Sequence, residues 1–487
     1  MQSLLIIKRH QLLTICLLSP VGVGVLRKIA PGQPAYIEVL AIGPVLLAAF
    51  WALHHRRSLS HRIAHPLLAW AFVQAMFALL TVRLDWRIGV AGVVMRIAPM
   101  LMTYVAFVTI RSQEDFQKVL SSVCKLAPIL LPVGIIGSLF GNDVLPFFLK
   151  PIDKLMLSEK YYRIGYQVVS TIFTTQWVMS WSMFAILFLA LISLNLTDRK
   201  SGSLWWWLVV ISALTLIYLS TRRGAFIAGL LGITLFLLQK RGQGRIKTIM
   251  AALTVLCVII ELDRHSSPVM NAYGQRSFSF LSDLNITDRF NKVFLDLFLL
   301  WLRLTPFGTG LGVTGPEGKA FGNVLGGLNF VAVEVGGAQL MAEMGIFGAF
   351  IMPLMLVLLL WNLRIRARGL ICCKAVNMLL FHNLILFVFY YTKGLLILSN
   401  LHVALFLFWA VPGICEALIQ SELAENRRGH TDSVPSPAET SLGIPDRFRP
   451  GVGAMLSRPV QAKTDLPLPS NECGFVYSKR SDSHVSE

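Results

Sequence analysis

The sequence contains repeated apolar stretches that are long enough to cross a lipid bilayer. A spanning helix needs roughly 17–25 mainly apolar residues, and about twelve such windows are present. Because backbone groups in lipid must be satisfied within each spanning segment, these windows predict helices. A mean hydropathy of +0.64, with only 14% charged residues, is too apolar for a soluble domain of 487 residues. We therefore expect an all-α integral membrane protein with windows at 11–27, 36–53, 66–82, 88–110, 119–140, 166–195, 204–220, 224–239, 246–262, 336–361, 375–393 and 398–419.

The orientation of these helices is predicted from the basic residues of the short loops, which are retained on the cytoplasmic side. With the first window read as an uncleaved helix and the N-terminus inside, every dense basic run falls on one side. Both termini are then cytoplasmic. The outer side holds the turn at Arg222 and Arg223 and the segments 141–165 and 263–335, the latter a large loop before the tenth helix. The inner basic runs are 8–10, 54–65, 111–118, 198–200, 239–247 and 364–374.

The formal charge of +18 is distributed unevenly along the chain. The tail from Ser421 to Glu487 holds 8 basic and 9 acidic residues, so the positive charge belongs to the membrane part. Its placement is mostly topological and gives no reason to expect a nucleic-acid partner. The tail is polar and rich in Pro and Ser, which is typical of disorder. We expect a transmembrane domain at 1–420 and a disordered cytoplasmic tail at 421–487.

The first candidate site is the outer turn between the windows 204–220 and 224–239. Arg222 and Arg223 interrupt two apolar runs, and Gly224 lets the backbone turn and a ligand approach closely. A guanidinium presents a planar set of donors that suits a phosphate. The alternative is that both arginines extend toward lipid headgroups.

The second candidate site is the stretch 285–315. Arg289 opens an apolar, helix-like run through Trp301, after which a glycine-rich turn begins. Gly310, Gly312 and Gly315 satisfy the dinucleotide pattern G-x-G-x-x-G, but no strand–helix–strand unit surrounds them. A flexible or tightly bent loop over a membrane-facing cleft is the better interpretation.

The third candidate site, 333–350, lies at the start of the tenth window. Gln339 and Glu343 are four residues apart and share a helix face, whereas Glu334, nine residues before Glu343, does not share it. A carboxylate in a spanning helix is costly and tends to be functional. The alternative for Glu343 is a salt bridge to an outer arginine.

These three segments together resemble the O-antigen ligase and polymerase family. The similar stretches are "STRRGAF", "TDRF…W…PFGTGLG" and "AQLMAEMGIFG", which lie between Ser220 and Gly348 within a region of resemblance at about 160–420. The resemblance implies a GT-C-like glycosyltransferase of the bacterial inner membrane whose active site faces the periplasm. Such enzymes transfer a glycan from undecaprenyl diphosphate and need neither a nucleotide sugar nor a metal cofactor. Possible protein partners are chain-length regulators and export proteins.

The resemblance also assigns roles to residues. Arg223 and Arg289 match arginines that would hold the diphosphate and stabilise its growing charge, and Arg163 in "YYRIGYQ" matches a third more weakly. The remaining expected substrate-binding residues are Arg222, Gln339, Glu343, Gly310 and Gly312.

One position departs from the family pattern. Ligases carry a histidine nine residues before the glutamate that Glu343 matches, and this chain has Glu334 there. Glutamate can also act as a general base, so Glu334 is the expected catalytic base. The change favours a polymerase of exopolysaccharide or O-antigen repeat units over a ligase that transfers polymer to lipid A core.

Other classes of protein remain open. A lipid-linked oligosaccharide flippase or another transporter would also have about twelve helices and buried charges such as Arg96, which the resemblance leaves unassigned. A structural scaffold would need no single outer arginine. Glu261 and Asp263 are separated by one residue and could form a metal site, but such a spacing often arises by chance. His382 and His402 are expected to serve packing or polar networks.

Overall fold

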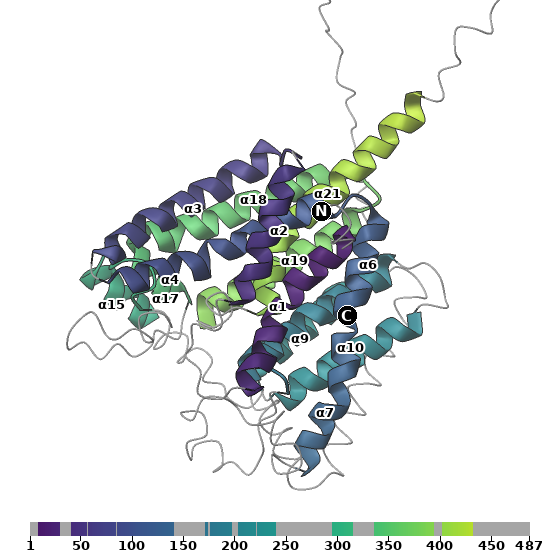
Figure 1. Ribbon diagram of the computed structural model, residues 1–487, viewed down its shortest axis with the longest axis horizontal. Coiled ribbons are helices and arrows are strands. Elements are labelled where there is room, and N and C mark those ends of the chain that lie inside the picture. The colour runs from purple at the N-terminus through teal and green to yellow at the C-terminus, as the bar shows by residue number, and fades with distance from the viewer. Residues whose placement is uncertain are drawn as a thin grey trace, which may run out of the picture. The chain divides into compact units, whose positions relative to one another are not determined.

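The computed structural model contains only helices and turns in the residues that it describes, which are 8–29, 40–55, 57–83, 85–140, 171–173, 176–196, 203–220, 222–239, 295–314, 336–393 and 402–431 (Figure 1). The α-helices are α1 (Arg9–Ile29), α2 (Gly43–His54), α3 (His61–Val82), α4 (Trp86–Arg96), α5 (Leu101–Thr109), α6 (Gln113–Cys124), α7 (Leu126–Phe140), α9 (Gln176–Leu196), α10 (Ser203–Leu219), α11 (Arg223–Gln239), α15 (Asp296–Leu304), α17 (Gly336–Ile346), α18 (Met352–Ala367), α19 (Cys373–Lys393) and α21 (Val403–Thr431). The described residues also include a 3₁₀ turn at 40–42, a second 3₁₀ turn, η2 (Ala98–Met100), and a π-helical turn, η6 (Phe347–Ile351).

The prediction of an α-helical membrane protein is confirmed at the level of helix length and composition. Eight segments are long and apolar enough to cross a membrane, and three shorter apolar helices accompany them. Every predicted window overlaps one of these helices except 246–262, which lies outside the described residues. The number of twelve spans, the GT-C-like arrangement and the large outer loop stay predictions.

Two predicted boundaries differ from the structure. The window 166–195 begins too early, because α9 starts at Gln176 and Thr171 adopts a positive φ of 50°. The stretch is rich in β-branched residues, which are weak helix formers. At the other end, α21 continues to Thr431, past the tail boundary expected at residue 420, and the compact unit ends there.

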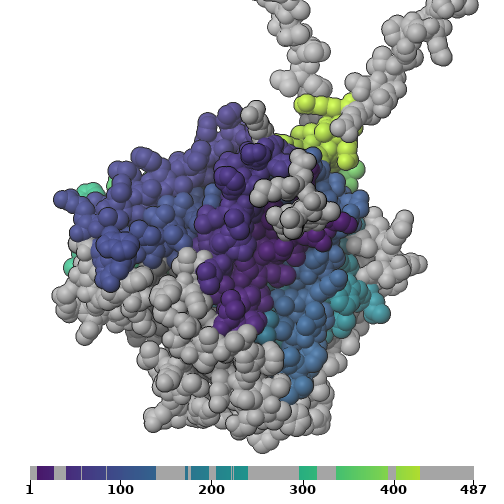
Figure 2. Space-filling model, viewed as in Figure 1, coloured from purple at the N-terminus to yellow at the C-terminus, as the bar shows by residue number. Residues whose placement is uncertain are grey.

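The helices divide into central ones and ones that face outward. The membrane windows of α9 and α21 are each 94% buried inside the protein, whereas that of α3 is 28% buried. The exposed side chains of α2 and α3 are nevertheless large and apolar, among them Phe50, Leu68 and Phe72. Figure 2 shows these helices in purple and blue on one face of the molecule. Apolar surface of this extent fits lipid better than water.

Helices α21 and α5 cross closely. A Cβ atom added at Gly413 would lie 1.9 Å from the carbonyl oxygen of Thr103. The Thr103 hydroxyl donates in turn to the carbonyl of Trp409 over 2.5 Å. Small residues that let backbones approach are the usual contact between helices in lipid, where apolar burial gives little advantage.

The helix ends form two separate groups. At the end that carries the basic runs, Arg57 donates to the carbonyls of Phe107 and Ile110, and Arg366 forms an ion pair with Glu416. Burial lowers the pKa of Arg57 from its ordinary value, with the neighbouring charge of Arg111 adding to the effect.

At the opposite end, α9, α11, α17 and α19 meet. The Cβ position of Gly224 lies 3.6 Å from Phe389, and that of Gly336 overlaps Tyr390. The ends that the charge pattern assigns to one side therefore contact one another, which agrees with the predicted alternation of the helices. Which side faces the cytoplasm stays a prediction.

The crossing at Gly413 gives a test of the fold. We expect Gly413→Ala to destabilise the protein by about 1–3 kcal/mol, because the added methyl group overlaps the backbone of α5. The matched control is Gly22→Ala in α1, where nothing lies within 4 Å of the added atom. Thermal unfolding in detergent, followed by the loss of the monodisperse chromatographic peak, compares the two. An unchanged midpoint for Gly413→Ala would contradict the crossing.

Candidate functional site

The candidate site lies where two broken spanning helices meet. The first break separates α4 from α5 at η2, because Pro99 has no N–H to bond the carbonyl of Met95. The helix before this break, α4, is capped at its N-terminus by Asp85, whose side chain accepts from the backbone N–H of Arg87 over 2.9 Å. The Arg87 guanidinium also bonds this carboxylate and lowers the pKa of Asp85. Helix α4 thereby begins at a fixed residue and ends at Arg96.

The second break lies in the last turn of α17, ahead of α18. Gly345 has φ 60° and ψ −151°, which are not helical values, and the π-helical turn η6 begins two residues later. Breaks of this kind leave backbone donors and acceptors without helical partners. In a bilayer such groups must find partners within the protein.

The glycine-rich turn at 305–314 supplies those partners. Ile346 would normally donate to the carbonyl of Ala342, but its N–H instead reaches the carbonyl of Pro306 over 3.0 Å. The carbonyl of Ala342 accepts from the N–H of Thr309 at 2.9 Å and from its hydroxyl at 3.0 Å. The N–H of Gly310 bonds the carbonyl of Glu343 at 2.9 Å. The turn therefore completes the broken helix.

Two glycines make this close contact feasible. A Cβ atom at Gly345 would lie 2.2 Å from the carbonyl oxygen of Pro306, and one at Gly310 would lie 2.3 Å from the hydroxyl of Thr81. Both residues have positive φ, 60° and 116°, which side chains other than glycine rarely adopt. The backbone geometry and the available space require glycine independently.

The same turn is bound to α3. Its Leu311 donates to the carbonyl of Phe77 over 3.2 Å and accepts from the Thr81 hydroxyl over 2.9 Å. Figure 1 shows α3, α4, α15 and α17 grouped together, and the contacts between these helices agree. The turn is thus fixed on more than one side, unlike a flexible loop.

A buried polar cluster lies beneath the turn. Glu343 Oε1 accepts from Gln339 Nε2 at 2.9 Å and from Thr314 Oγ1 at 3.1 Å. Arg96 Nη2 lies 3.3 Å from Glu343 Oε2, and the two side chains are 5% and 0% exposed. We call these four residues, Arg96, Thr314, Gln339 and Glu343, the Glu343 cluster. Because the arginine neutralises the glutamate, the cluster can be buried without a net charge.

The cluster leaves two acceptor atoms open. Gln339 Oε1 and Glu343 Oε2 are buried and have no hydrogen-bond partner among the described residues, although the second is within ion-pair distance of Arg96. A buried acceptor without a donor is costly, by about 1–3 kcal/mol. Such a pair of acceptors suits a ligand that brings hydroxyl groups.

The turn with the two arginines lies at the start of α11. The guanidinium carbon of Arg222 is 4.0 Å from the centre of the Trp177 ring in α9, a cation–π contact. The side chain of Arg223 lies outside the described residues, but its backbone begins α11 next to Gly224 and Phe389. Since α17 begins beside Tyr390, this turn and the start of α17 border the same end of α19.

The structure therefore brings together some of the predicted site residues. Gln339, Glu343, Gly310 and the turn that contains Gly312 form one unit. Glu343 does form a salt bridge, but its partner is Arg96 within a span and not the outer arginine that the alternative predicts. Those that lie outside the described residues are Arg163, Arg289, Glu334, Glu261 and Asp263.

The roles of Arg96, Thr314 and Thr81 could not be predicted from the sequence. The sequence shows a lone arginine in an apolar window, but the separation of 247 residues between Arg96 and Glu343 gives no local sign of their pairing.

His382 is buried against Phe184 and bonds Asn383, and the His402 ring accepts from the N–H of Leu405, so both histidines serve packing or polar networks as expected.

Comparisons with protein families and with curated proteins give no relative. No protein-family model matches the sequence, and no curated protein matches it. The family and the function therefore depend on the residues and their geometry alone. The described segments form an all-helical chain in which several helices are long enough to span a membrane.

The break at Gly345 gives a test of the site. We expect Gly345→Ala to lower stability by several kcal/mol, because it combines positive φ with the overlap on Pro306. Gly369→Ala is the matched control, since Gly369 has φ 82° but open space around its Cβ position. It should lose only about 1–2 kcal/mol. Equal melting temperatures for the two variants would contradict the docking of the turn.

The Glu343 cluster gives a second test. We expect Arg96→Gln or Glu343→Gln to cost about 3–5 kcal/mol each, because either change leaves one buried charge without its counter-charge. The double variant should lose less than the sum of the two, as a double-mutant cycle of thermal unfolding would measure. The exposed pair Lys118–Glu114 in α6 is the control and should show no coupling. Additive losses for Arg96 and Glu343 would mean that they do not interact.

Proposed function

We propose that this protein is a bacterial membrane glycosyltransferase that polymerises the repeat units of an exopolysaccharide or O-antigen. It would transfer a glycan from undecaprenyl diphosphate to the growing chain at the periplasmic face of the inner membrane. The observation that supports this best is the direct contact between two of the three segments that carry the family resemblance. "PFGTGLG" and "AEMGIFG" are hydrogen-bonded to each other over a buried polar cluster.

The chemistry of the Glu343 cluster suits a sugar. Its open acceptors, Gln339 Oε1 and Glu343 Oε2, can receive the hydroxyl groups of a saccharide and so orient it. The Glu343 carboxylate is already engaged in the ion pair with Arg96. Glu343 is then a binding residue, and the role of general base goes to Glu334.

The proposed reaction is a single displacement. Glu334 takes the proton of the acceptor hydroxyl, whose oxygen attacks the anomeric carbon of the donor. The bond from that carbon to the diphosphate breaks, and undecaprenyl diphosphate leaves with the electron pair. Arg223, Arg289 and Arg163 would stabilise the charge that grows on the diphosphate, the task that a metal performs in other glycosyltransferases.

A ligase that transfers finished polymer to lipid A core is the nearest alternative. The same arginines and the same carrier would serve it, so only the acceptor differs. The glutamate at position 334, where ligases of the family have a histidine, favours the polymerase.

A flippase or transporter is the candidate from another class, and one observation favours it. The ion pair Arg96–Glu343 lies between two broken helices, roughly 15 Å along α4 from Trp86 and roughly 10 Å along α17 from Gly336, at 1.5 Å per residue. Transporters often hold charged groups at such breaks near the bilayer midplane. Their arginines at the outer turn would then be dispensable.

The function is tested by complementation of a deletion strain. The variants are Arg223→Ala, Arg289→Ala and Glu334→Gln, with the surface and lipid-linked glycans sized by gel and mass spectrometry. For a polymerase we expect single repeat units to accumulate on the carrier, with a loss of polymer of at least 100-fold for each variant. Arg83→Ala, an exposed arginine predicted on the same side of the membrane, is the control and should leave the polymer unchanged.

Each other outcome contradicts the polymerase in its own way. Polymer of full length that stays on the carrier indicates the ligase. Repeat units that remain on the cytoplasmic side, inaccessible to an external glycosidase, indicate the flippase. Polymer of normal length and attachment in all three variants, with protein present in the membrane, would refute any catalytic role for these residues.

A further inference from the structure

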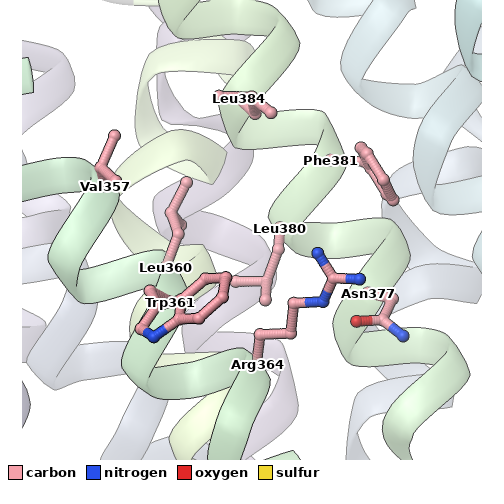
Figure 3. Close-up of a pocket in the computed structure, with 8 residues that line it drawn as sticks. All are labelled: Val357, Leu360, Trp361, Arg364, Asn377, Leu380, Phe381 and Leu384. Carbon is pink, nitrogen blue, oxygen red and sulfur yellow. The ribbon is translucent and has the colours of Figure 1, made fainter.

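A groove runs between α18 and α19, away from the Glu343 cluster. It has a volume of about 160 Å³ (Figure 3). Since the two helices are antiparallel and joined by a short turn, Arg364 and Asn377 lie together at the end near that turn. Val357 and Leu384 lie at the far end, seven residues or roughly 10 Å along each helix. The groove is lined by Val357, Leu360, Trp361, Arg364, Asn377, Leu380, Phe381 and Leu384.

The lining has an apolar length and one polar end. Six of its eight residues are aliphatic or aromatic, which suits a hydrocarbon chain and not a sugar or a nucleotide. Figure 3 shows the guanidinium of Arg364 beside the side-chain amide of Asn377. Both groups donate hydrogen bonds, and the guanidinium suits a phosphate.

The surroundings of the groove are those of a lipid-facing surface. Val357, Leu358 and Trp361 of α18 are 54%, 50% and 54% exposed, although α18 belongs to a predicted membrane span. Apolar side chains exposed within such a span contact acyl chains. A lipid molecule therefore has direct access to the groove from the bilayer.

The turn at the polar end carries excess positive charge. Arg364, Arg368 and Lys374 are exposed, and none forms an ion pair with any of the described residues. Two acids lie near this turn. Glu416 is paired with Arg366 and also accepts from Gln420, while Glu422 lies on the turn itself and accepts the backbone N–H groups of residues 371 and 372. The three cations therefore outnumber the one carboxylate at the turn, and the net positive charge that remains suits an external anion.

We propose that the groove between α18 and α19 is a binding site for an anionic phospholipid of the leaflet on the basic side of the protein. One acyl chain fills the groove past Leu360 and Leu380, and the phosphate bonds Arg364 and Asn377, with Arg368 and Lys374 nearby. The polar end of the groove lies next to the basic turn between α18 and α19. The helix ends at Arg222 and Gly336 lie on the opposite side of the protein. A carrier lipid whose diphosphate lies at those opposite ends cannot place its head here, so the site is separate from the proposed glycan transfer.

The site is tested by native mass spectrometry of the full-length protein released from nanodiscs. The nanodiscs contain phosphatidylcholine with increasing phosphatidylglycerol. We expect the wild type to retain one phosphatidylglycerol in preference to phosphatidylcholine. Arg364→Gln should weaken the retention of phosphatidylglycerol about fivefold, since one basic group near a headgroup contributes about that factor. The control Arg62→Gln removes another exposed basic residue predicted on the same side and should have no effect.

The acyl part of the site has its own pair of variants. Val357→Trp should reduce retention of both lipids by filling the end of the groove, whereas Leu358→Trp, at the neighbouring and equally exposed position outside the lining, should not. Both changed side chains are on the surface, so folding should be preserved, and the protein's mass spectrum verifies this. Equal effects of Arg364→Gln and Arg62→Gln, equal retention of both lipids by the wild type, or a protein dimer that Val357→Trp dissociates would each overturn the proposal.

Discussion

The docking of the turn 305–314 on the break at Gly345 is the interaction on which the candidate site depends. A spanning helix can be broken only where another part of the protein completes its backbone hydrogen bonds. Here Pro306, Thr309 and Gly310 do so, and the turn is bound in its own right to α3. This docking also fixes the geometry of the Glu343 cluster, because Thr314 belongs to the turn and Glu343 belongs to the helix that the turn completes.

This dependence explains why a charged pair can exist at such depth. Arg96 reaches Glu343 from α4, which ends at the 3₁₀ turn that Pro99 imposes. Two short helices that end inside the protein bring their polar side chains to a place that two straight spanning helices would fill with apolar packing. Ionisable residues within spanning segments are costly and tend to be functional.

Local sequence signals predicted the helices well and their interruptions poorly. Hydropathy identified every described span, because a run of apolar residues in lipid has one main solution. The basic loops also predicted which helix ends lie together. The helix break at Gly345 could not be predicted, because glycine is common in spanning helices and no neighbouring residue distinguishes Gly345 from Gly348. Arg96 was seen and left without a partner, because a pairing across 247 residues has no local signature.

The same separation has a consequence for biosynthesis. At a synthesis rate of about 5–20 residues per second, Glu343 leaves the ribosome roughly 12–50 s after Arg96. During that interval α4 enters the membrane with a charge that its final counter-ion cannot yet neutralise. The insertion machinery has to hold this segment at the aqueous boundary, or admit it with its arginine extended to the headgroups, until the tenth predicted window arrives. The order of these residues along the chain means that the N-terminal half of the helix bundle cannot reach its final structure until the C-terminal half has been made.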